Sequence, residues 1–233
     1  WDDTLMCSSA INANQVMVHQ AQQLEALLEQ VLSLSMQLGE TVVVTNADEL
    51  WVVESTRRFC PRAFAAVSQV GVLSARRRYE RLYPGDVFAW KRETFREVIA
   101  ARRAGGGAAL NLVVLGDSLV EMEAAQTATA GLPFPVVIKT VKFREAPSAD
   151  ELLDQLRTVA GDLRSIVGDE RSSSRSLVQR MAPARSLASA PPYYVANSFV
   201  RAPLACDPQA VPAPFPAPAA PYLGAAPVYA SGR

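Results

Sequence analysis

One stretch of the sequence brings carboxylates to a position where they could do chemistry. The apolar run Leu112–Leu115 leads directly into Gly116 and Asp117, and a second acid, Glu121, follows four residues later. This pattern predicts a buried parallel strand with Asp117 at its carboxyl end, the edge at which open α/β sheets bind ligands. A glycine there permits close backbone approach, and two neighbouring carboxylates suit a hard cation such as Mg²⁺.

The same residues also have a purely structural interpretation. Ser118 and Glu121 have the spacing of a helix capping box, in which two side chains satisfy free amide groups at the start of a helix. The stretch alone therefore leaves both a metal site and a simple helix start open.

Composition limits the classes of protein that fit. Of the 233 residues, 49% are hydrophobic and 20% are charged, enough for one core of roughly 150 residues. The 23 basic residues balance 23 acidic ones, which argues against a nucleic-acid or membrane partner. The 3 cysteines lack CxxC spacing, so a reducing, cytoplasmic compartment fits best. No apolar run approaches the roughly 20 residues that span a membrane.

Strand and helix patterns alternate along the chain, which predicts an α/β fold with a doubly wound parallel sheet. Continuous apolar character marks the expected strands, 41–45, 70–73, 112–115 and 134–142. Apolar residues at the helical period mark the longest expected helices, 11–38, 48–59, 90–104 and 148–167. Gly105–Gly107 should form a flexible link rather than a phosphate loop, because no Gly-Lys-Ser/Thr follows.

We expect an α/β domain over residues 1–167 and an extended tail over residues 168–233. The tail is first rich in Ser and Arg and then in Pro and Ala, with eleven of the 16 prolines after residue 180. Such a composition predicts a polyproline-type or disordered segment without a core. Its scattered aromatic residues predict a protein partner along residues 170–233.

A cluster of arginine and tyrosine side chains lies between the second strand and the following helix. Its members are Arg76, Arg77, Arg78, Tyr79, Arg81 and Tyr83. Two interpretations are open: the cluster binds phosphate or RNA, or it is a solvated loop in which arginines pair with carboxylates.

Four short motifs resemble, in order, those of the haloacid dehalogenase (HAD-like) superfamily, whose members are mostly phosphatases. Trp1–Thr4 matches Asp-x-Asp-x-Thr from its second position onward, and Thr45-Asn46 ends the next strand. Lys91 matches the lysine of the third motif, and Gly116–Glu121 matches Gly-Asp-x-x-x-Asp/Glu. The resemblance covers roughly residues 1–167, and the combination is also similar to a group of such proteins from algae and protists.

The resemblance implies a Rossmann-like core, dependence on Mg²⁺ and an aspartyl-phosphate intermediate. In the family the first aspartate of the first motif is the nucleophile, which corresponds to the residue before Trp1. We expect a longer protein to supply this aspartate and the central strand; the alternative is that the nucleophile is absent. Without that strand, ladder groups in the core would be unpaired.

By the same resemblance, each candidate residue has an expected role. Asp2 would act as general acid and base and touch the metal, while Thr45 and Asn46 would hold phosphate oxygens. Lys91 would bind phosphate and neutralise charge on the transferring group. Asp117 would ligate Mg²⁺ with support from Glu121, which makes Asp2, Asp117 and Glu121 the expected metal set.

Two functions from different classes follow. The first is a phosphatase without a cap domain, whose open site would accept a large phosphorylated substrate such as a phosphoprotein. The second is a catalytically silent structural subunit, anchored by its tail in a ciliary or cytoskeletal assembly, because a fold alone does not fix function. An organellar location stays open, since a targeting segment would precede Trp1.

Overall fold

The computed structural model describes residues 1–103 and 109–178. The expected glycine link at Gly105–Gly107 lies outside these residues, as does the proline-rich tail from residue 179 onward. The predicted partner of residues 170–233 therefore concerns a segment of which only 170–178 are described.

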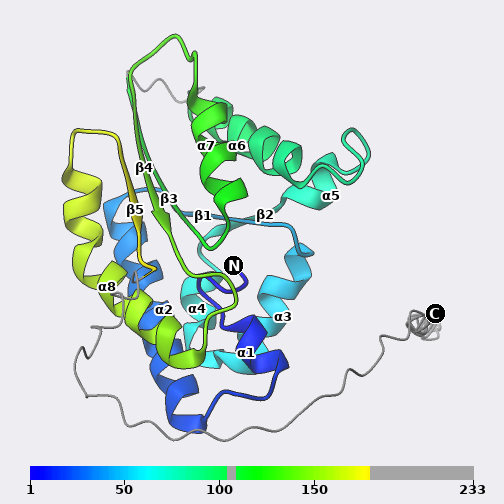
Figure 1. The fold of residues 1–233 in the computed structure, drawn as a ribbon, viewed down its shortest axis with the longest axis vertical. Helices are drawn as coiled ribbons and strands as arrows, with labels where there is room; N and C mark the ends of the chain where they lie inside the picture. The colour runs from blue at the N-terminus through cyan, green and yellow to red at the C-terminus, as the bar shows by residue number, and fades with distance from the viewer. Residues whose placement is uncertain (104–108, 179–233) are drawn as a thin grey trace, which may run out of the picture. The chain divides into compact units, whose positions relative to one another are not determined.

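Parallel strands form two small sheets within the described residues (Figure 1). One sheet pairs β1 (Val42–Thr45) with β2 (Gly71–Ser74). The other has the order β3-β4-β5, with β3 at Leu110–Gly116, β4 at Val136–Lys142 and β5 at Ser173–Ser176. The predicted α/β class with parallel strands is confirmed, but its strands are divided between two sheets.

Helices precede or follow each of the first four strands. They are α1 (Ser8–Asn12), α2 (Val18–Leu38), α3 (Glu49–Phe59), η1 (Pro61–Ala63), α4 (Phe64–Val67), α5 (Ala75–Tyr79), α6 (Val87–Arg103), α7 (Leu119–Thr129) and α8 (Ala149–Gly168). No helix in the described part of the chain combines the length and apolar character needed to cross a membrane.

The surroundings of strand β3 show why its sequence is continuously apolar. Val113 and Leu115 pack against a cluster that includes residues of α2, α8 and β4, whereas Val114 belongs to a cluster with α6 and α7. Because successive strand residues point to opposite faces, both faces of β3 are covered. In Figure 1, α2 and α8 lie side by side, and α6 and α7 form a second pair.

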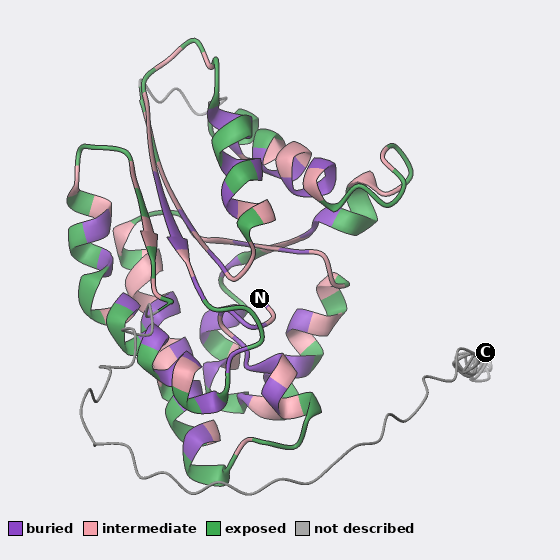
Figure 2. Cartoon of the chain, viewed as in Figure 1, coloured by how far each residue is buried: buried purple, intermediate pink, exposed green. Residues whose placement is uncertain are grey.

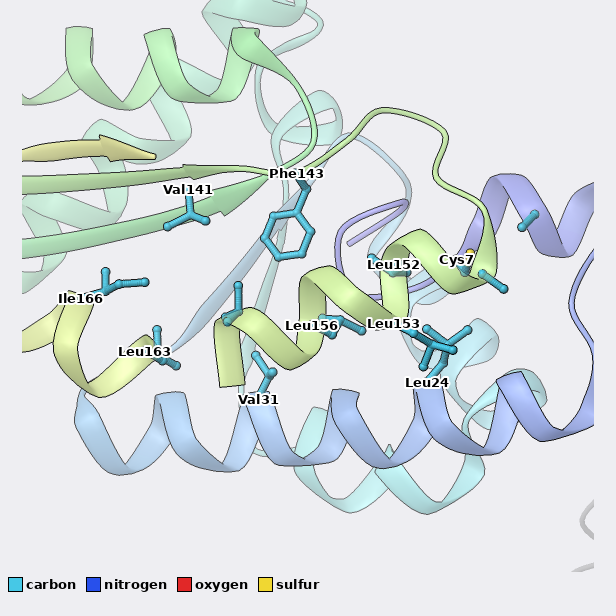
Figure 3. Close-up of a cluster of buried hydrophobic side chains, with 13 residues drawn as sticks. Cys7, Leu24, Val31, Val141, Phe143, Leu152, Leu153, Leu156, Leu163 and Ile166 are labelled. Atoms are coloured by element: carbon cyan, nitrogen blue, oxygen red, sulfur yellow. The ribbon is translucent and has the colours of Figure 1, made fainter. Parts of the chain in front are cut away.

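The largest core cluster joins α2, α8 and β4. Phe143, which is 0% exposed, follows β4 and points toward α8, where Leu156 is also 0% exposed (Figure 3). Buried residues recur along α8 at intervals of three and four, so exposed and buried patches alternate along this helix (Figure 2). Ser148 and Glu151 form the capping box that begins α8.

The predicted helix 11–38 is two helices. Residues 13–17 separate α1 from α2, and Asn14 has a positive φ of 54°, a conformation that asparagine tolerates better than most residues. Helix α2 begins where the side chain of Gln20 accepts a hydrogen bond from the backbone of Met17 at 2.9 Å. A turn at residues 13–17 therefore interrupts the single helix that the spacing of apolar residues predicted.

The predicted start of α6 at Trp90 is three residues late. The Asp86 side chain accepts a hydrogen bond from the Ala89 amide at 2.9 Å, so Asp86 caps a helix that begins at Val87. The segment after β2 also contains a short helix, α5, whose first turn is capped by Ser74. Both helices begin after residues that commonly cap helices. These caps were not recognised in the sequence because one precedes a run of arginines and the other lies in the Pro84–Asp86 turn.

Three arginines of the cluster form ion pairs with carboxylates, as the interpretation of a solvated loop predicts. Arg76 pairs with Glu80, Arg77 with Glu49 and Arg78 with Glu97. These ion pairs are largely exposed, and such pairs contribute little to stability.

Strand β5 was not predicted. It lies beyond residue 167, in the Ser/Arg-rich segment that composition had assigned to the tail, and it pairs with β4. The α/β unit therefore continues past residue 167 to include β5. Its serine-rich sequence lacks the apolar pattern that marks a buried strand.

Candidate functional site

Four segments that are distant in the sequence meet at the carboxyl ends of β1 and β3. The Thr4 hydroxyl donates a hydrogen bond to Asp117 Oδ1 at 3.2 Å. Lys91 Nζ, from α6, donates to the Val44 carbonyl at 2.8 Å and to Glu121 Oε1 at 2.7 Å. One lysine thus connects the end of β1 with the first turn of α7.

The ion pair between Lys91 and Glu121 is largely removed from solvent, with side chains 4% and 16% exposed. Glu121 Oε2 is buried and has no hydrogen-bond partner among the described residues. The capping box that the sequence allowed is not formed, because Ser118 accepts from the Val120 amide while Glu121 turns to Lys91. The carboxylate therefore belongs to the site and retains one free acceptor.

The α-amino nitrogen of Trp1 is buried, and the charges of this arrangement act on it. Burial and the nearby charge of Lys91 lower the pKa of the amino group, whereas Glu121, Asp2 and Asp117 act in the opposite direction. The charges of the predicted lysine and of all three predicted metal carboxylates therefore act on one buried position.

Helix α3 holds the residues at the start of the chain. Trp51 Nε1 donates to Asp2 Oδ1 at 2.9 Å, and Trp1 Nε1 donates to Ser55 Oγ at 3.0 Å. Trp51 and Ser55 are four residues apart and so lie on one face of the helix. The sequence analysis missed both residues, although their spacing after the Asp48 cap was a usable signal.

Asp3 has a structural role instead. It accepts hydrogen bonds from the Ser9 amide at 2.9 Å and from the Ser8 hydroxyl at 3.3 Å, at the start of α1. Asp3 has a positive φ of 51° and begins the turn at residues 3–5. Asp2 and Thr4 on either side face Trp51 and Asp117 respectively.

The expected phosphate-binding pair consists of Thr45, the last residue of β1, and Asn46, which follows it. The buried Thr45 hydroxyl accepts a hydrogen bond from the Ala47 amide at 3.0 Å, and its own O–H remains able to donate. Asn46 Oδ1 is a buried acceptor without a hydrogen-bond partner in the described part of the chain. The Thr45 hydroxyl therefore keeps a free proton, and Asn46 keeps a free acceptor oxygen.

The expected metal set is only partly assembled. Within residues 1–103 and 109–178, no group of three His, Cys, Asp or Glu side chains is arranged to hold a metal ion. Asp2 is engaged by Trp51, which leaves Asp117 and Glu121 with its free Oε2. Two carboxylates still fit Mg²⁺, which is commonly held by one or two carboxylates plus water and phosphate oxygens.

Asp117 gives a pH-dependent prediction. Burial and the charge of Glu121 raise the pKa of Asp117 above its usual 3.8, so the folded state binds this proton more tightly than the unfolded state. Ionised Asp117 therefore costs stability above the folded pKa, and the cost vanishes below 3.8. With a chelator present, Asp117→Asn, which keeps an acceptor for Thr4, should be more stable than the parent at neutral pH.

Urea unfolding at neutral pH and at acidic pH checks this expectation, and the difference should disappear in acid. Asp169→Asn is the matched control, because a hydrogen bond from the Arg171 amide lowers the pKa of half-buried Asp169, so this change should bring no gain. A neutral-pH loss for Asp117→Asn would show that the ionised carboxylate is stabilised by its surroundings.

The charges of Lys91, Glu121, Asp2 and Asp117 all act on the buried Trp1 nitrogen, and Trp51 donates a hydrogen bond to Asp2. In the described residues, no hydrogen bond joins Asp2 directly to Asp117 or Glu121. A scan against family models and searches of curated proteins and solved structures found no match to this chain.

Proposed function

We propose that this chain forms the core of a Mg²⁺-dependent phosphatase of haloacid dehalogenase type, with an aspartyl-phosphate intermediate. The nucleophilic aspartate would be the residue joined to the α-amino nitrogen of Trp1. The observation that carries the proposal is the cluster at the strand ends, where Lys91 pairs with Glu121 and Thr4 donates to Asp117. The charges of this cluster act on the buried α-amino nitrogen of Trp1. A residue attached there would enter the polar site directly.

The charges of the site support a phosphate and a divalent cation together. The carboxylates of Asp2, Asp117 and Glu121 act on one buried position together with Lys91. A second lysine, Lys142, donates a hydrogen bond to the Asp117 carbonyl, so three negative charges meet two positive ones. A divalent cation at Asp117 and Glu121 would offset this excess, orient the phosphate and stabilise its charge. The orphaned Glu121 Oε2 is an acceptor and therefore suits a cation or a water molecule bound to one.

The remaining side chains have roles that their contacts allow. Lys91 would stabilise negative charge on the phosphoryl group, to which Thr45 would donate a hydrogen bond. Asp2, oriented by Trp51, would protonate the leaving oxygen and later take a proton from the attacking water. The nucleophile divides one displacement into two easier steps.

The connections between the motifs support an open site and hence a large substrate such as a phosphoprotein. Between Trp1–Thr4 and β1 the chain forms only α1 and α2. Between β1 and Lys91 it forms α3, η1, α4, β2, α5 and the start of α6, with no inserted cap domain. Exposed Leu50 and Leu119 begin the helices after β1 and β3, and they provide apolar surface near the strand ends.

The test is a chain extended by an apolar strand that ends in aspartate directly before Trp1. With Mg²⁺ it should hydrolyse an aryl phosphate and a phosphopeptide, and hydroxylamine should trap the acyl-phosphate. Replacing the added aspartate by asparagine should abolish turnover, and Asp117→Asn should lower it by on the order of a hundredfold or more. Asp169→Asn, at the C-cap of α8, should leave turnover unchanged.

A folded, extended chain without turnover on either substrate would contradict the phosphatase proposal. Equal efficiency on the two substrates would contradict the preference for large ones. The structural-subunit alternative depends on residues 170–233, most of which lie outside the described residues, so the geometry supports the enzyme instead.

A further inference from the structure

A cavity of about 270 Å³ lies where the first residues of the chain pack against α1, α2 and the end of α3. We call it the cysteine pocket, and its lining residues are Leu5, Met6, Cys7, Ile11, Asn14, Val16, Ala21, Leu24, Phe59 and Cys60. A larger cavity, of about 330 Å³, lies between the two sheets and has Trp1 and Glu121 in its lining. The larger cavity therefore belongs to the candidate site, whereas the cysteine pocket has no part in it so far.

The cysteine pocket lies where two clusters of the hydrophobic core meet. Cys7 and Leu24 belong to the cluster that contains α8, and Met6 and Cys60 belong to the cluster that contains α4. All four side chains are buried. Protein interiors contain few voids larger than a water molecule, and the walls of such a void lack the dispersion contacts of a filled core. An apolar ligand would restore those contacts.

The lining of the pocket is electrically neutral. All of its described residues are uncharged at neutral pH, since burial and the charge of Asp3 raise the pKa of the Cys7 thiol to about 11. Burial and the charge of Glu25 raise the pKa of the Cys60 thiol to about 12. A charged ligand would lose its hydration there without gaining a partner of opposite charge from the lining. The pocket therefore suits a neutral molecule.

Sulfur atoms and an aromatic ring distinguish this pocket from an ordinary aliphatic cavity. Met6, Cys7 and Cys60 contribute three sulfur atoms, which make favourable contacts with aromatic rings. Phe59 adds a ring that can stack on another or meet its edge. A cavity of about 150 Å³ is large enough to bind benzene, so about 270 Å³ leaves room for two fused rings. Exposed Asn14 provides an amide for a polar substituent.

We propose that the cysteine pocket is a binding site for a small, neutral aromatic molecule of one or two rings. The ring would pack against the sulfur atoms and Phe59, and a polar substituent would be directed to Asn14. The inference rests on the volume and the lining of the pocket, so it does not depend on the phosphatase proposal.

The pocket shares a hydrogen-bonded turn with the residues of the candidate site. The amides of Leu5 and Met6 each donate to the Trp1 carbonyl at 3.0 Å, and the Asp3 amide donates to the Met6 carbonyl at 2.7 Å. Thr4 lies within this turn. A ligand that packs against Leu5 and Met6 would therefore also stabilise the turn that positions Thr4.

Titration of the chain with indole, under reducing conditions, tests the proposal. Indole is neutral and has two fused rings, so calorimetry should detect saturable binding to one site. Because the ligand binds the folded state, it should also raise the melting temperature with increasing concentration. Nuclear Overhauser effects should connect the indole protons with the methyl groups of Met6 and Leu24, which places the ligand in the cysteine pocket.

A variant that fills the pocket provides a second measurement. Ala21 lines the pocket from α2, and leucine is also a good helix former. Ala21→Leu should weaken indole binding by about tenfold or more, because the added atoms occupy the ligand's space. Ala26→Leu is the matched control, since Ala26 is an exposed residue of the same helix, and it should leave the affinity unchanged. Circular dichroism checks that both variants fold, and the Overhauser effects in the parent chain decide if Ala21→Leu does not.

Four outcomes would overturn the inference. The first is the absence of saturable indole binding, and the second is an equal effect of Ala21→Leu and Ala26→Leu on the affinity. The third is a set of Overhauser effects to Val31 and Leu163, which line the larger cavity instead. The fourth is tighter binding of indole-3-acetate than of indole. That result would identify an anionic ligand held by Arg58, whose guanidinium lies 5.1 Å from the centre of the Phe59 ring.

Discussion

Replacing Lys91 with methionine should lower the free energy of unfolding by about 3–5 kcal/mol, the loss typical of breaking a buried ion pair. The methionine side chain keeps much of the volume of lysine but provides no charge for Glu121, whose side chain is 16% exposed. It also leaves the Val44 carbonyl without its donor. Glu121 would then be a buried charge with two unsatisfied oxygens, because Oε2 already has no hydrogen-bond partner among the described residues. Urea denaturation of the parent and the variant measures the loss.

A double-mutant cycle separates the coupling energy of the Lys91–Glu121 pair from the cost of leaving one buried charge unpaired. Lys91→Met combined with Glu121→Leu should recover much of the stability, since apolar replacement of both partners of a buried pair is often neutral. Arg157→Met is the surface control, because Arg157 and Asp154 are 51% and 74% exposed, and it should cost at most about 1 kcal/mol. Additive effects of the two changes at Lys91 and Glu121 would show that the pair is not coupled.

Replacing Gly116 with alanine should be the next most damaging change, with an expected loss of about 1–3 kcal/mol from overpacking. A Cβ atom at this position would lie 2.0 Å from Glu121 Oε2 and 3.0 Å from the methyl carbon of Met122. A free glutamate could swing away at little cost, but Glu121 is held through Oε1 by Lys91. The glycine is therefore needed for space beside Asp117 rather than for an unusual backbone conformation.

The cost of Gly116→Ala should shrink when Glu121→Ala is already present, because the clashing carboxylate is then gone. Gly161→Ala is the matched control in the interior of α8, where no atom lies within 4 Å of the added Cβ. That change should stabilise the protein by about 0.5–1 kcal/mol through helix propensity. Thermal and urea unfolding of the variants provide the comparison, and equal losses in both backgrounds would reject the steric explanation.

The sequence by itself determined the local structure of the chain. Continuous apolar runs identified the strands β1 to β4, and the helical periods of α3 and α8 were recognisable, the latter with its cap at Ser148. These features depend on neighbours a few residues apart, so spacing and residue type suffice to find them. The missed elements, α5 and β5, are short, and β5 lacks an apolar pattern.

Tertiary structure decided which of the candidate side chains act together. Glu121 had two possible partners, Ser118 in its own helix and Lys91 thirty residues away, and the packing of α6 against α7 selected Lys91. The bond between Thr4 and Asp117 spans 113 positions, and Trp51 reaches Asp2 from another helix. The split between the two sheets and the cavity between them likewise depend on edges that are far apart in the sequence. Such contacts form only when distant segments fold together. The pattern of neighbouring residues in the sequence does not indicate which distant side chain will be the partner.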